Sequence, residues 1–376
     1  MMSIAQRVAV LLIGLATGAA AVGAPATDDP EVAKLAKEVR NKGWIMYGVT
    51  TLTGDMDLYV MRPDGSDQRR ITHTPGFYEG APRFSPDGKK VLYRKVSTKT
   101  KLHHNYWGYQ GKIVIANADG SDPVTIGKEG QYPWASWSPD GKQISILTRR
   151  GIQIVDLATK KVVRTLPRKG MYQQLFWSPD GKWFCGVTNA LGESWTVARL
   201  NAETGEINGV RKAADTTEET APDPNPVGWM GAECTPDWFP DSKHILFSHR
   251  PRAREGRSWT QLWMAQGDGK RQRMVYGEAG RHIYGGTLSP DAKYILFSRV
   301  WMDGGGGLLS GTHMGLARFP DGPSIGGKNK QLMRSQYPDA KDAVVLELPL
   351  GWEPTWTYAD LSPKQGQTAT RSTVKD

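Results

Sequence analysis

Trp137-Ser-Pro-Asp-Gly141 is one of five related segments that recur along the sequence. The other four are Phe84-Ser-Pro-Asp-Gly88, Trp177-Ser-Pro-Asp-Gly181, Phe239-Pro-Asp-Ser242 and Leu288-Ser-Pro-Asp-Ala292. A lysine and an apolar or aromatic run follow each segment, as in Lys142 and Gln143-Ile-Ser-Ile146. Proline fixes φ in a turn, and glycine tolerates the positive φ that a tight turn requires. The repeat therefore predicts a strand, a tight turn and a second strand at each place.

A second kind of turn follows most of these hairpins. Leu58-Tyr-Val-Met61 precedes Pro63-Asp-Gly-Ser66, and Ile113-Val-Ile115 precedes Ala118-Asp-Gly-Ser121. Each pair predicts a third strand, a turn and a short fourth strand. Four strands in about 40 to 60 residues is the period of a β-propeller blade. The 43 Gly, 24 Pro, 14 Trp and 13 Tyr agree with many short strands joined by tight turns.

The two ends of the repeat region complement each other. Trp352-Glu-Pro-Thr-Trp-Thr-Tyr358 resembles an innermost strand, such as Tyr132-Pro-Trp-Ala-Ser-Trp137, but no second strand follows it. Trp44-Ile-Met-Tyr-Gly48 resembles a second strand with no innermost strand before it. Together they complete one blade, which removes an exposed sheet edge. We therefore predict an all-β fold, a six-bladed β-propeller of four-stranded antiparallel blades closed by pairing of the N-terminal strand with the C-terminal inner strand.

Two of these motifs resemble a known family. The runs Ser85-Pro-Asp-Gly-Lys-Lys90 and Val60-Met-Arg-Pro-Asp-Gly-Ser66 look like the WD-related repeat of the TolB-like β-propeller family. The resemblance covers roughly residues 44–360. It implies a propeller fold and favours a non-catalytic binding or scaffold protein. The α/β domain that precedes the propeller in TolB itself is not expected here, because only residues 29–43 separate the predicted signal from the first strand.

Residues 1–26 have the pattern of a secretory signal peptide. A short basic segment ending at Arg7 precedes the apolar stretch Val8–Ala16, and small residues allow cleavage near Ala21 or Ala26. An uncleaved anchor is the alternative, because the apolar and small residues together are just long enough to cross a bilayer. We expect a periplasmic or secreted protein.

The rest of the chain divides into three parts. Residues 27–43 predict one short helix with Asp29 as its N-cap and Gly43 as its stop. Residues 44–360 form the predicted propeller, and the polar residues 361–376 predict a flexible tail.

Charge and cysteine content limit the possible partners. The net charge of +10 favours anionic partners such as acidic polysaccharide, cell-wall polymer or lipid headgroups. Nucleic acid is not expected, because the protein is predicted to be exported and its basic residues are scattered over turns. Cys185 and Cys234 are too few for a disulfide framework, so two buried thiols or one bridge both fit the sequence. We expect a monomer.

The long connections of the predicted blades share one face. The links after the first and third strands are tight turns, whereas those after the second and fourth are long. The long links are residues 97–111, 211–233, 249–260, 300–312 and 334–351. Long loops on one side of a rigid scaffold usually carry binding or catalysis, although a scaffold can also merely tolerate them. We predict that this face is the functional one.

The predicted positions of the histidines also favour this face. Six of the seven lie on or beside it, namely His73, His103, His104, His249, His282 and His313. Their spacing fixes no metal site, because the ligands would have to come from different blades. No cofactor is expected; if a divalent metal binds, the candidate ligands are His103, His249 and His282.

The first residues of the inner strands lie at one end of the predicted central channel, which we call the mouth. They are rich in aromatic and carboxylate side chains, and an arginine cluster lies in a neighbouring loop. The predicted binding residues are Tyr78, Glu79, Tyr132, Tyr172, Gln173, Glu233, Arg250, Arg252, His282, Tyr284, Trp352 and Glu353. Aromatic rings with interleaved carboxylates suit a sugar or a threaded peptide segment. Packing between neighbouring blades is the alternative explanation.

Two functions fit this arrangement. The first is a non-catalytic binding or scaffold propeller whose ligand is a glycan, a cell-wall fragment or a protein segment. The second is a propeller-fold polysaccharide lyase on acidic glycans, with His103, His282, Tyr284 and Arg281 as candidate catalytic residues. A serine hydrolase is not expected, because the predicted propeller leaves no room in the chain for a separate hydrolase domain.

Overall fold

The structure is a computed structural model of the 376-residue chain. It describes residues 27–100, 110–131, 134–191, 196–210, 233–249, 260–278, 281–301, 313–320 and 344–363. The predicted signal peptide and most of the predicted tail and long loops lie outside these residues. Among the described residues, no helix is both long and apolar enough to span a lipid bilayer.

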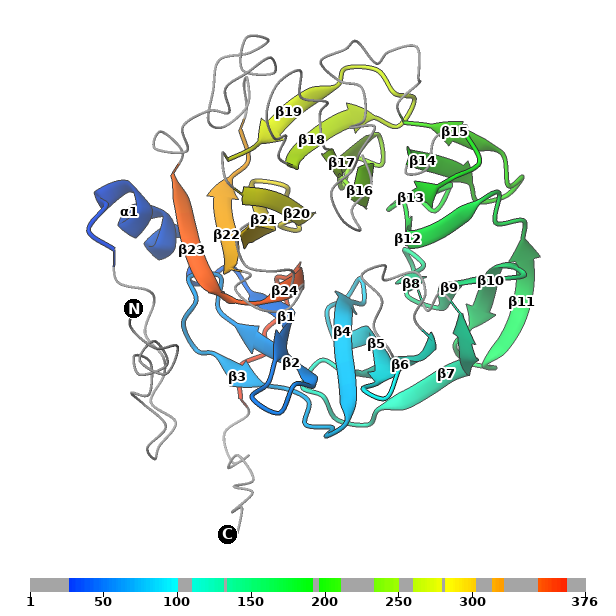
Figure 1. The fold of residues 1–376 in the computed structure, drawn as a ribbon, viewed down its shortest axis with the longest axis horizontal. Helices are drawn as coiled ribbons and strands as arrows, with labels where there is room; N and C mark the ends of the chain where they lie inside the picture. Colours follow the sequence, from blue (N-terminus) through cyan, green and yellow to red (C-terminus); the bar gives the residue numbers. More distant parts are fainter. Residues whose placement is uncertain are drawn as a thin grey trace, which may run out of the picture.

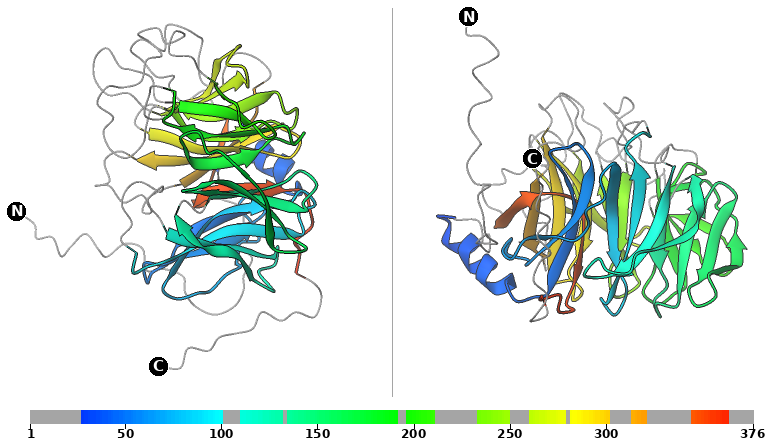
Figure 2. Two further views of the ribbon diagram at one scale, coloured as in Figure 1. Left: turned by 90° about the vertical axis from the view of Figure 1, so that its right-hand side faces the viewer. Right: turned by 90° about the horizontal axis from the view of Figure 1, so that it is seen from below.

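Among the described residues, one helix, α1 (Pro30–Val39), precedes the strands. Asp29 is its N-cap, because one carboxylate oxygen accepts hydrogen bonds from the main-chain N–H groups of Glu31 and Val32. Leu35 and Val39 are fully buried and share a hydrophobic cluster with residues of the last sheet. The helix therefore lies on the rim of the molecule beside β23, as Figure 2 shows.

Four sheets contain four antiparallel strands each in the described part of the chain (Figure 1). Their strands are β8 (Trp134–Trp137), β9 (Gln143–Thr148), β10 (Gly151–Asp156) and β11 (Lys161–Leu166); β12 (Met171–Trp177), β13 (Trp183–Thr188), β14 (Thr196–Asn201) and β15 (Ile207–Gly209); β16 (Glu233–Trp238), β17 (His244–His249), β18 (Gln261–Gln266) and β19 (Arg273–Tyr276); and β20 (Arg281–Leu288), β21 (Tyr294–Trp301), β22 (His313–Arg318) and β23 (Val345–Leu350). The predicted all-β fold of four-stranded antiparallel sheets is confirmed.

The remaining strands form one larger sheet with eight strands. They are β1 (Trp44–Thr50), β2 (Met56–Met61), β3 (Arg69–Arg70), β4 (Phe77–Phe84), β5 (Lys90–Ser97), β6 (Gln110–Asn117), β7 (Val124–Gln131) and β24 (Trp352–Thr357). The sequence predicts two separate sheets here. They are joined because β2 and β4 pair in parallel at a single position, Met56 opposite Tyr78.

The N-terminal strand pairs with the last strand of the chain. β1 and β24 are antiparallel, with Ile45 opposite Trp356. In Figure 1 the sheets are arranged around a common centre, with β4, β12, β16, β20 and β24 near it and β11, β15 and β23 toward the rim. Neighbouring inner strands contact one another, so side chains from different sheets meet at the centre.

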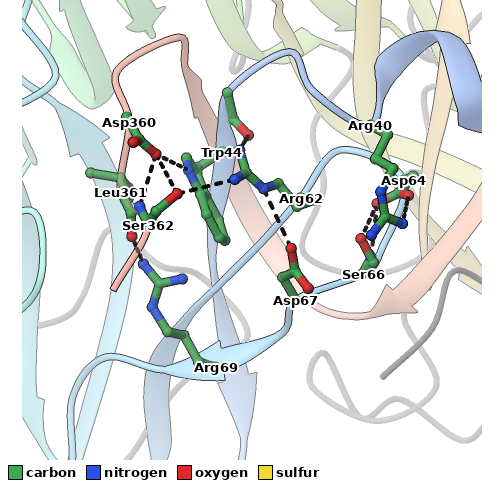
Figure 3. A network of polar contacts seen from close by, with 11 residues as sticks. Arg40, Trp44, Arg62, Asp64, Ser66, Asp67, Arg69, Asp360, Leu361 and Ser362 are labelled. Atoms are coloured by element: carbon green, nitrogen blue, oxygen red, sulfur yellow. Dashed lines mark hydrogen bonds and ion pairs between the residues drawn. The ribbon is translucent and has the colours of Figure 1, made fainter. Parts of the chain in front are cut away.

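Segments beyond β24 are held against the first strands (Figure 3). The indole of Trp44 lies between two guanidinium groups, 3.9 Å from Arg62 and 4.3 Å from Arg69. The Trp44 indole N–H donates to Asp360, and Arg62 donates to the Ser362 hydroxyl at 3.1 Å. The predicted tail thus begins with Leu361 and Ser362, which accept hydrogen bonds from Arg69 in β3 and from Arg62 in the β2–β3 connection.

Apolar side chains fill the space between neighbouring sheets. One cluster contains Leu246 and Leu262 from one sheet and Ile283 and Phe297 from the next, all fully buried. Middle strands such as β13 and β17 are buried on both faces in this way, whereas the rim strand β11 is mostly exposed. The middle strands accordingly read as near-continuous apolar runs rather than as alternating patterns.

The recurrent Ser-Pro-Asp turn has a specific hydrogen-bond pattern. In the first example, the Ser85 hydroxyl donates to Asp87 at 2.6 Å and accepts from the main-chain N–H of Lys90 at 3.0 Å. The same contacts recur at Ser138 and Ser178. The serine hydrogen bond lowers the pKa of the Asp87 carboxyl. The serine and the aspartate are therefore needed together, because each turn uses both.

We expect Ser178→Ala to lower the free energy of unfolding by about 1–2 kcal/mol, because the fully buried Ser178 hydroxyl is the acceptor of the partly buried Trp183 N–H. Urea denaturation measures the change. Ser121→Ala is the matched control, since the exposed Ser121 hydroxyl makes the same kind of bond to Asp119 at 2.6 Å. We expect a change below about 0.5 kcal/mol there. Equal losses in the two variants would contradict the explanation.

Candidate functional site

Five inner strands contain an irregularity at the same place relative to the turn that follows. In each of them, one residue has a positive φ and the pairing register with the next strand shifts around it. These residues are Ala81 (52°), Gln174 (51°), Thr235 (48°), Gly285 (60°) and Glu353 (49°). A positive φ strains any residue other than glycine by about 1–3 kcal/mol, and β-bulges of this kind are common beside functional sites.

The bulged residues connect neighbouring inner strands. The Gln174 amide oxygen accepts from the main-chain N–H of Thr235 at 2.6 Å. The Thr235 hydroxyl in turn accepts from the main-chain N–H of Gly285 at 3.2 Å and bonds the Ser248 hydroxyl at 2.6 Å. β12, β16 and β20 are thus linked by side-chain hydrogen bonds near the centre, which offsets part of the backbone strain.

Two carboxylates and two arginines also lie among the inner strands. Arg94 lies 3.8 Å from Glu353 and 4.8 Å from the centre of the Trp134 ring. Arg83 donates to two carbonyl oxygens at the bulges, Pro82 at 3.0 Å and Pro354 at 3.4 Å. Burial raises the pKa of the Glu353 carboxyl, and the positive charges of Arg94 and Arg83 act in the opposite direction. The centre therefore contains charged and polar groups beside aromatic side chains.

The second of these carboxylates belongs to Asp237 in β16. Burial raises the pKa of Asp237, while Arg83 and a 2.8 Å hydrogen bond from the Thr287 hydroxyl act to lower it. Arg83 also stacks on Phe176, 4.6 Å from the ring centre. Arg83 thus acts on carboxyls from two different strands, Asp237 and Glu353.

Four aromatic residues from four inner strands belong to one hydrophobic cluster. We call Tyr78, Trp134, Tyr284 and Trp352 the central aromatic cluster. The Tyr284 and Trp352 rings lie 6.5 Å apart between centres. Tyr284 and Trp352 are 2% and 6% exposed, whereas Tyr78 is only partly buried. Three predicted binding residues are therefore brought together, and Tyr78 is the one with the most exposed ring.

His282 is fixed by Thr260. Its Nδ1 accepts from the Thr260 main-chain N–H at 3.0 Å and lies 2.8 Å from the Thr260 hydroxyl. The imidazole also stacks on Tyr284, with 5.6 Å between ring centres. Because Nδ1 is an acceptor, the proton of the neutral ring is on Nε2. In this tautomer a further proton can bind only at Nδ1. His282 could therefore accept a proton only if its hydrogen bond from the Thr260 N–H broke.

Arg281, which precedes His282 in β20, contacts a different residue, Glu278. Glu278 accepts two hydrogen bonds from Arg299, at 2.7 and 2.9 Å, and lies 3.5 Å from Arg281. Glu278 also bonds the Tyr276 hydroxyl. The guanidinium of Arg281 therefore belongs to a buried ion-pair network between β19, β20 and β21.

Glu79 and Gln173, two further predicted binding residues, are both buried. The Glu79 side chain is fully buried, with one oxygen 3.0 Å from the Lys95 ammonium in β5. Successive side chains of a strand point to opposite faces, so Glu79 and Tyr78 cannot both face the centre. Gln173 in β12 is 4% exposed.

The other predicted site residues have different positions. Tyr172 lies in β12 and Glu233 in β16. His249 in β17 is fully buried and packs edge-on against Trp263, 5.2 Å between ring centres. Residues outside the described part of the chain are His103, Tyr132, Arg250 and Arg252.

Metal ligands and cysteines can be assessed for the described residues. Within those ranges, no group of three or more His, Cys, Asp or Glu side chains is placed to hold a metal ion. Cys185 and Cys234 are both buried and do not form a disulfide. Of the two possibilities that the sequence leaves open, the structure therefore has two buried thiols.

The sequence analysis missed the bulges and the arginines at the centre. A signal for three of the bulges exists, because a proline follows the bulged residue in Ala81-Pro82, Thr235-Pro236 and Glu353-Pro354. No local pattern marks Arg83 or Arg94, because they are two of 48 Lys and Arg residues spread along the chain.

Comparison with known structures identifies the fold. The crystal structure of TolB from Acinetobacter baumannii superposes with a TM-score of 0.57 at 17% sequence identity. The match covers 84% of this chain and 67% of that chain. The chain therefore has the fold of a TolB-like β-propeller.

Sequence relatives match only in short segments. A TolB homolog from Chlorobium luteolum is 44% identical over 55 residues, which are 14% of this chain and 12% of that protein. An uncharacterized protein from Agrobacterium fabrum is 28% identical over 106 residues, 27% of this chain and 35% of that protein. The chain thus spans well under half the length of these two relatives. No protein-family model matches it.

Proposed function

We propose that this chain is an exported, six-bladed propeller that acts as a non-catalytic binding or scaffold protein. Its ligand is a glycan, a cell-wall fragment or a segment of an envelope protein. The ligand contacts the mouth and the long-loop face. The observation that supports this proposal is the convergence of Tyr78, Trp134, Tyr284 and Trp352 from four inner strands. Residues 1–26 would direct the chain to the periplasm or the exterior.

The six-blade count rests on the pairing of the two ends. β24, β1, β2 and β3 form a path of paired strands equivalent to each four-stranded sheet. In this assignment β4–β7 is the next blade, and the Met56–Tyr78 pair is a contact between two blades. A closed ring of six blades would fix the inner strands rigidly around the mouth.

A glycan or a peptide segment suits the chemistry of the mouth. Aromatic rings stack on the apolar faces of sugars and on extended peptide side chains. The Arg94–Glu353 pair and the bulges place charged and main-chain polar groups behind the rings. Binding pockets commonly combine an aromatic lining with a few fixed polar groups in this way.

Binding is favoured over polysaccharide lyase chemistry by the state of the candidate catalytic residues. A lyase needs a base that is free to accept a proton. The Nδ1 atom of His282 already accepts from Thr260, and Arg281 lies beside Glu278. Both side chains therefore have structural partners where the lyase proposal needs reactive groups.

Binding can be tested by titrating the protein with a soluble muropeptide, an oligouronate and an extended peptide while recording tryptophan fluorescence. We expect one of these probes to bind and Tyr78→Ala to weaken it by about tenfold, which corresponds to about 1.4 kcal/mol. Tyr59→Ala is the matched control, because Tyr59 is also partly buried but lies in β2 outside the central aromatic cluster.

Three results would overturn the proposal. The first is the absence of binding by all three probes, and the second is an equal loss in the Tyr78 and Tyr59 variants. The third is the release of an unsaturated, ultraviolet-absorbing product from the oligouronate, which would show lyase activity.

A further inference from the structure

A pocket of about 360 Å³ lies where the segment after β3 meets β4, β5, β6 and β7. These strands are in the lower part of Figure 1. Its lining includes Thr72, Phe77, Tyr93, Lys95 and Lys112. The volume is at the lower end of the range for small-molecule sites. One sugar-sized molecule fits such a space.

Two lysines lie side by side in the lining of this pocket. Lys95 in β5 and Lys112 in β6 are directly opposite in the strand register. Like charges at directly opposite positions destabilise a sheet. Lys112 is exposed, and no ion pair connects it to another residue in the part of the chain that the structure describes. An anion placed between the two ammonium groups would reduce their mutual repulsion.

One buried carboxylate holds Lys95 in place without neutralising the pair. The Glu79 side chain is fully buried, and one of its oxygens lies 3.0 Å from the Lys95 ammonium. The nearby Asp57 carboxyl is bonded to Arg70, so this pair adds no net charge. Two lysines against one carboxylate leave the pocket with one surplus positive charge.

The rest of the lining is aromatic and hydroxylated. The Lys95 ammonium lies 4.8 Å from the centre of the Phe77 ring, so the ring and the charge are adjacent. Burial raises the pKa of the Tyr93 hydroxyl, which therefore stays protonated at neutral pH. Thr72 and Thr125 add hydroxyl groups to the wall. A ring with hydroxyl substituents would find both apolar and hydrogen-bonding partners here.

We propose that this pocket binds a small ring-shaped molecule that carries a carboxylate, such as a hexuronate. The carboxylate lies between Lys95 and Lys112, and the ring lies against Phe77. The two lysines supply charge-assisted hydrogen bonds to the oxyanion. The lining of this pocket shares no residue with the central aromatic cluster, so the proposal does not depend on the function proposed for that cluster.

Calorimetric titration with glucuronate, glucose and inorganic phosphate tests the proposal. We expect glucuronate to bind about tenfold or more tightly than either of the others, and to bind less tightly as salt is added. Glucose lacks the carboxylate, and phosphate lacks the ring. If glucose binds as well as glucuronate, the lysines have no role as anion ligands. If phosphate binds as well, the ring has no role. Either result overturns the proposal.

Amino-acid substitutions test whether glucuronate binds in this pocket. Lys112→Met should weaken glucuronate by about tenfold, whereas Lys142→Met should leave it unchanged, because Lys142 is an equally exposed lysine in a turn. Lys95→Met alone would leave Glu79 buried without its partner, so the double variant Lys95→Met/Glu79→Gln is the better test. The double variant should remain folded and lose glucuronate binding. Unchanged affinity in either the Lys112 variant or the double variant would overturn the proposal, and Tyr78→Ala should have no effect on this site.

Discussion

Replacing Glu278 by Gln is expected to lower the free energy of unfolding by about 3–5 kcal/mol. Glu278 is the shared acceptor of Arg299 and Arg281, and its side chain is 5% exposed. Removing one partner of a buried ion pair leaves the other charge buried without compensation, which costs this amount. Gln has nearly the same shape as Glu, so the decrease in unfolding free energy would reflect the missing negative charge rather than a cavity. Urea denaturation followed by circular dichroism measures it.

Glu347→Gln is the matched control for this prediction. Glu347 lies 3.0 Å from the same Arg299 guanidinium, but its side chain is 56% exposed. Exposed ion pairs contribute about 0–1 kcal/mol because water solvates both groups. If both variants lose the same free energy, burial is not the cause and the network does not stabilise the junction of β19, β20 and β21.

The Ser-Pro-Asp motif predicted its hairpins well because the interactions that define it are local. The serine, the aspartate and the following strand residue bond one another within six residues of chain, as at Ser178, Asp180 and Trp183. The N-terminal helix is a similar case, since Asp29 bonds main-chain groups two and three residues away. Local chemistry of this kind is readable from one sequence.

The centre was less predictable because it depends on contacts between distant strands. Tyr78 and Glu79 are adjacent in the sequence and were predicted to act together at the mouth. Alternation along β4 separates them, so that Tyr78 joins the aromatic cluster while Glu79 pairs with Lys95. In β24 the bulge at Glu353 interrupts the same alternation, and Trp352 and Glu353 both remain near the centre. A bulge depends on the neighbouring strands, which one segment of sequence does not describe.

Trp356→Ala is expected to lower the free energy of unfolding by about 3–5 kcal/mol, the usual cost of removing a large buried aromatic side chain. Trp356 is 6% exposed, and its indole N–H donates to the Lys42 carbonyl oxygen at 2.6 Å. Its ring lies 5.9 Å from that of Tyr294, so it contacts the last sheet as well as β1. Tyr358→Ala is the control, because Tyr358 is adjacent but 41% exposed and should lose about 1 kcal/mol or less.

The shape of the unfolding transition tests whether the ring is closed. If the β24–β1 pairing closes a ring of six blades, each blade depends on two neighbours and the ring lacks an end from which to unfold. Guanidinium unfolding of Trp356→Ala should then remain a single transition at a lower midpoint, with tryptophan fluorescence and circular dichroism coinciding. An early partial transition that leaves the other sheets intact would instead show an open array, because open repeat arrays lose their terminal units first. Since the proposed mouth is formed by inner strands from around this ring, closure would also keep Tyr78 and Trp352 at a fixed separation for binding.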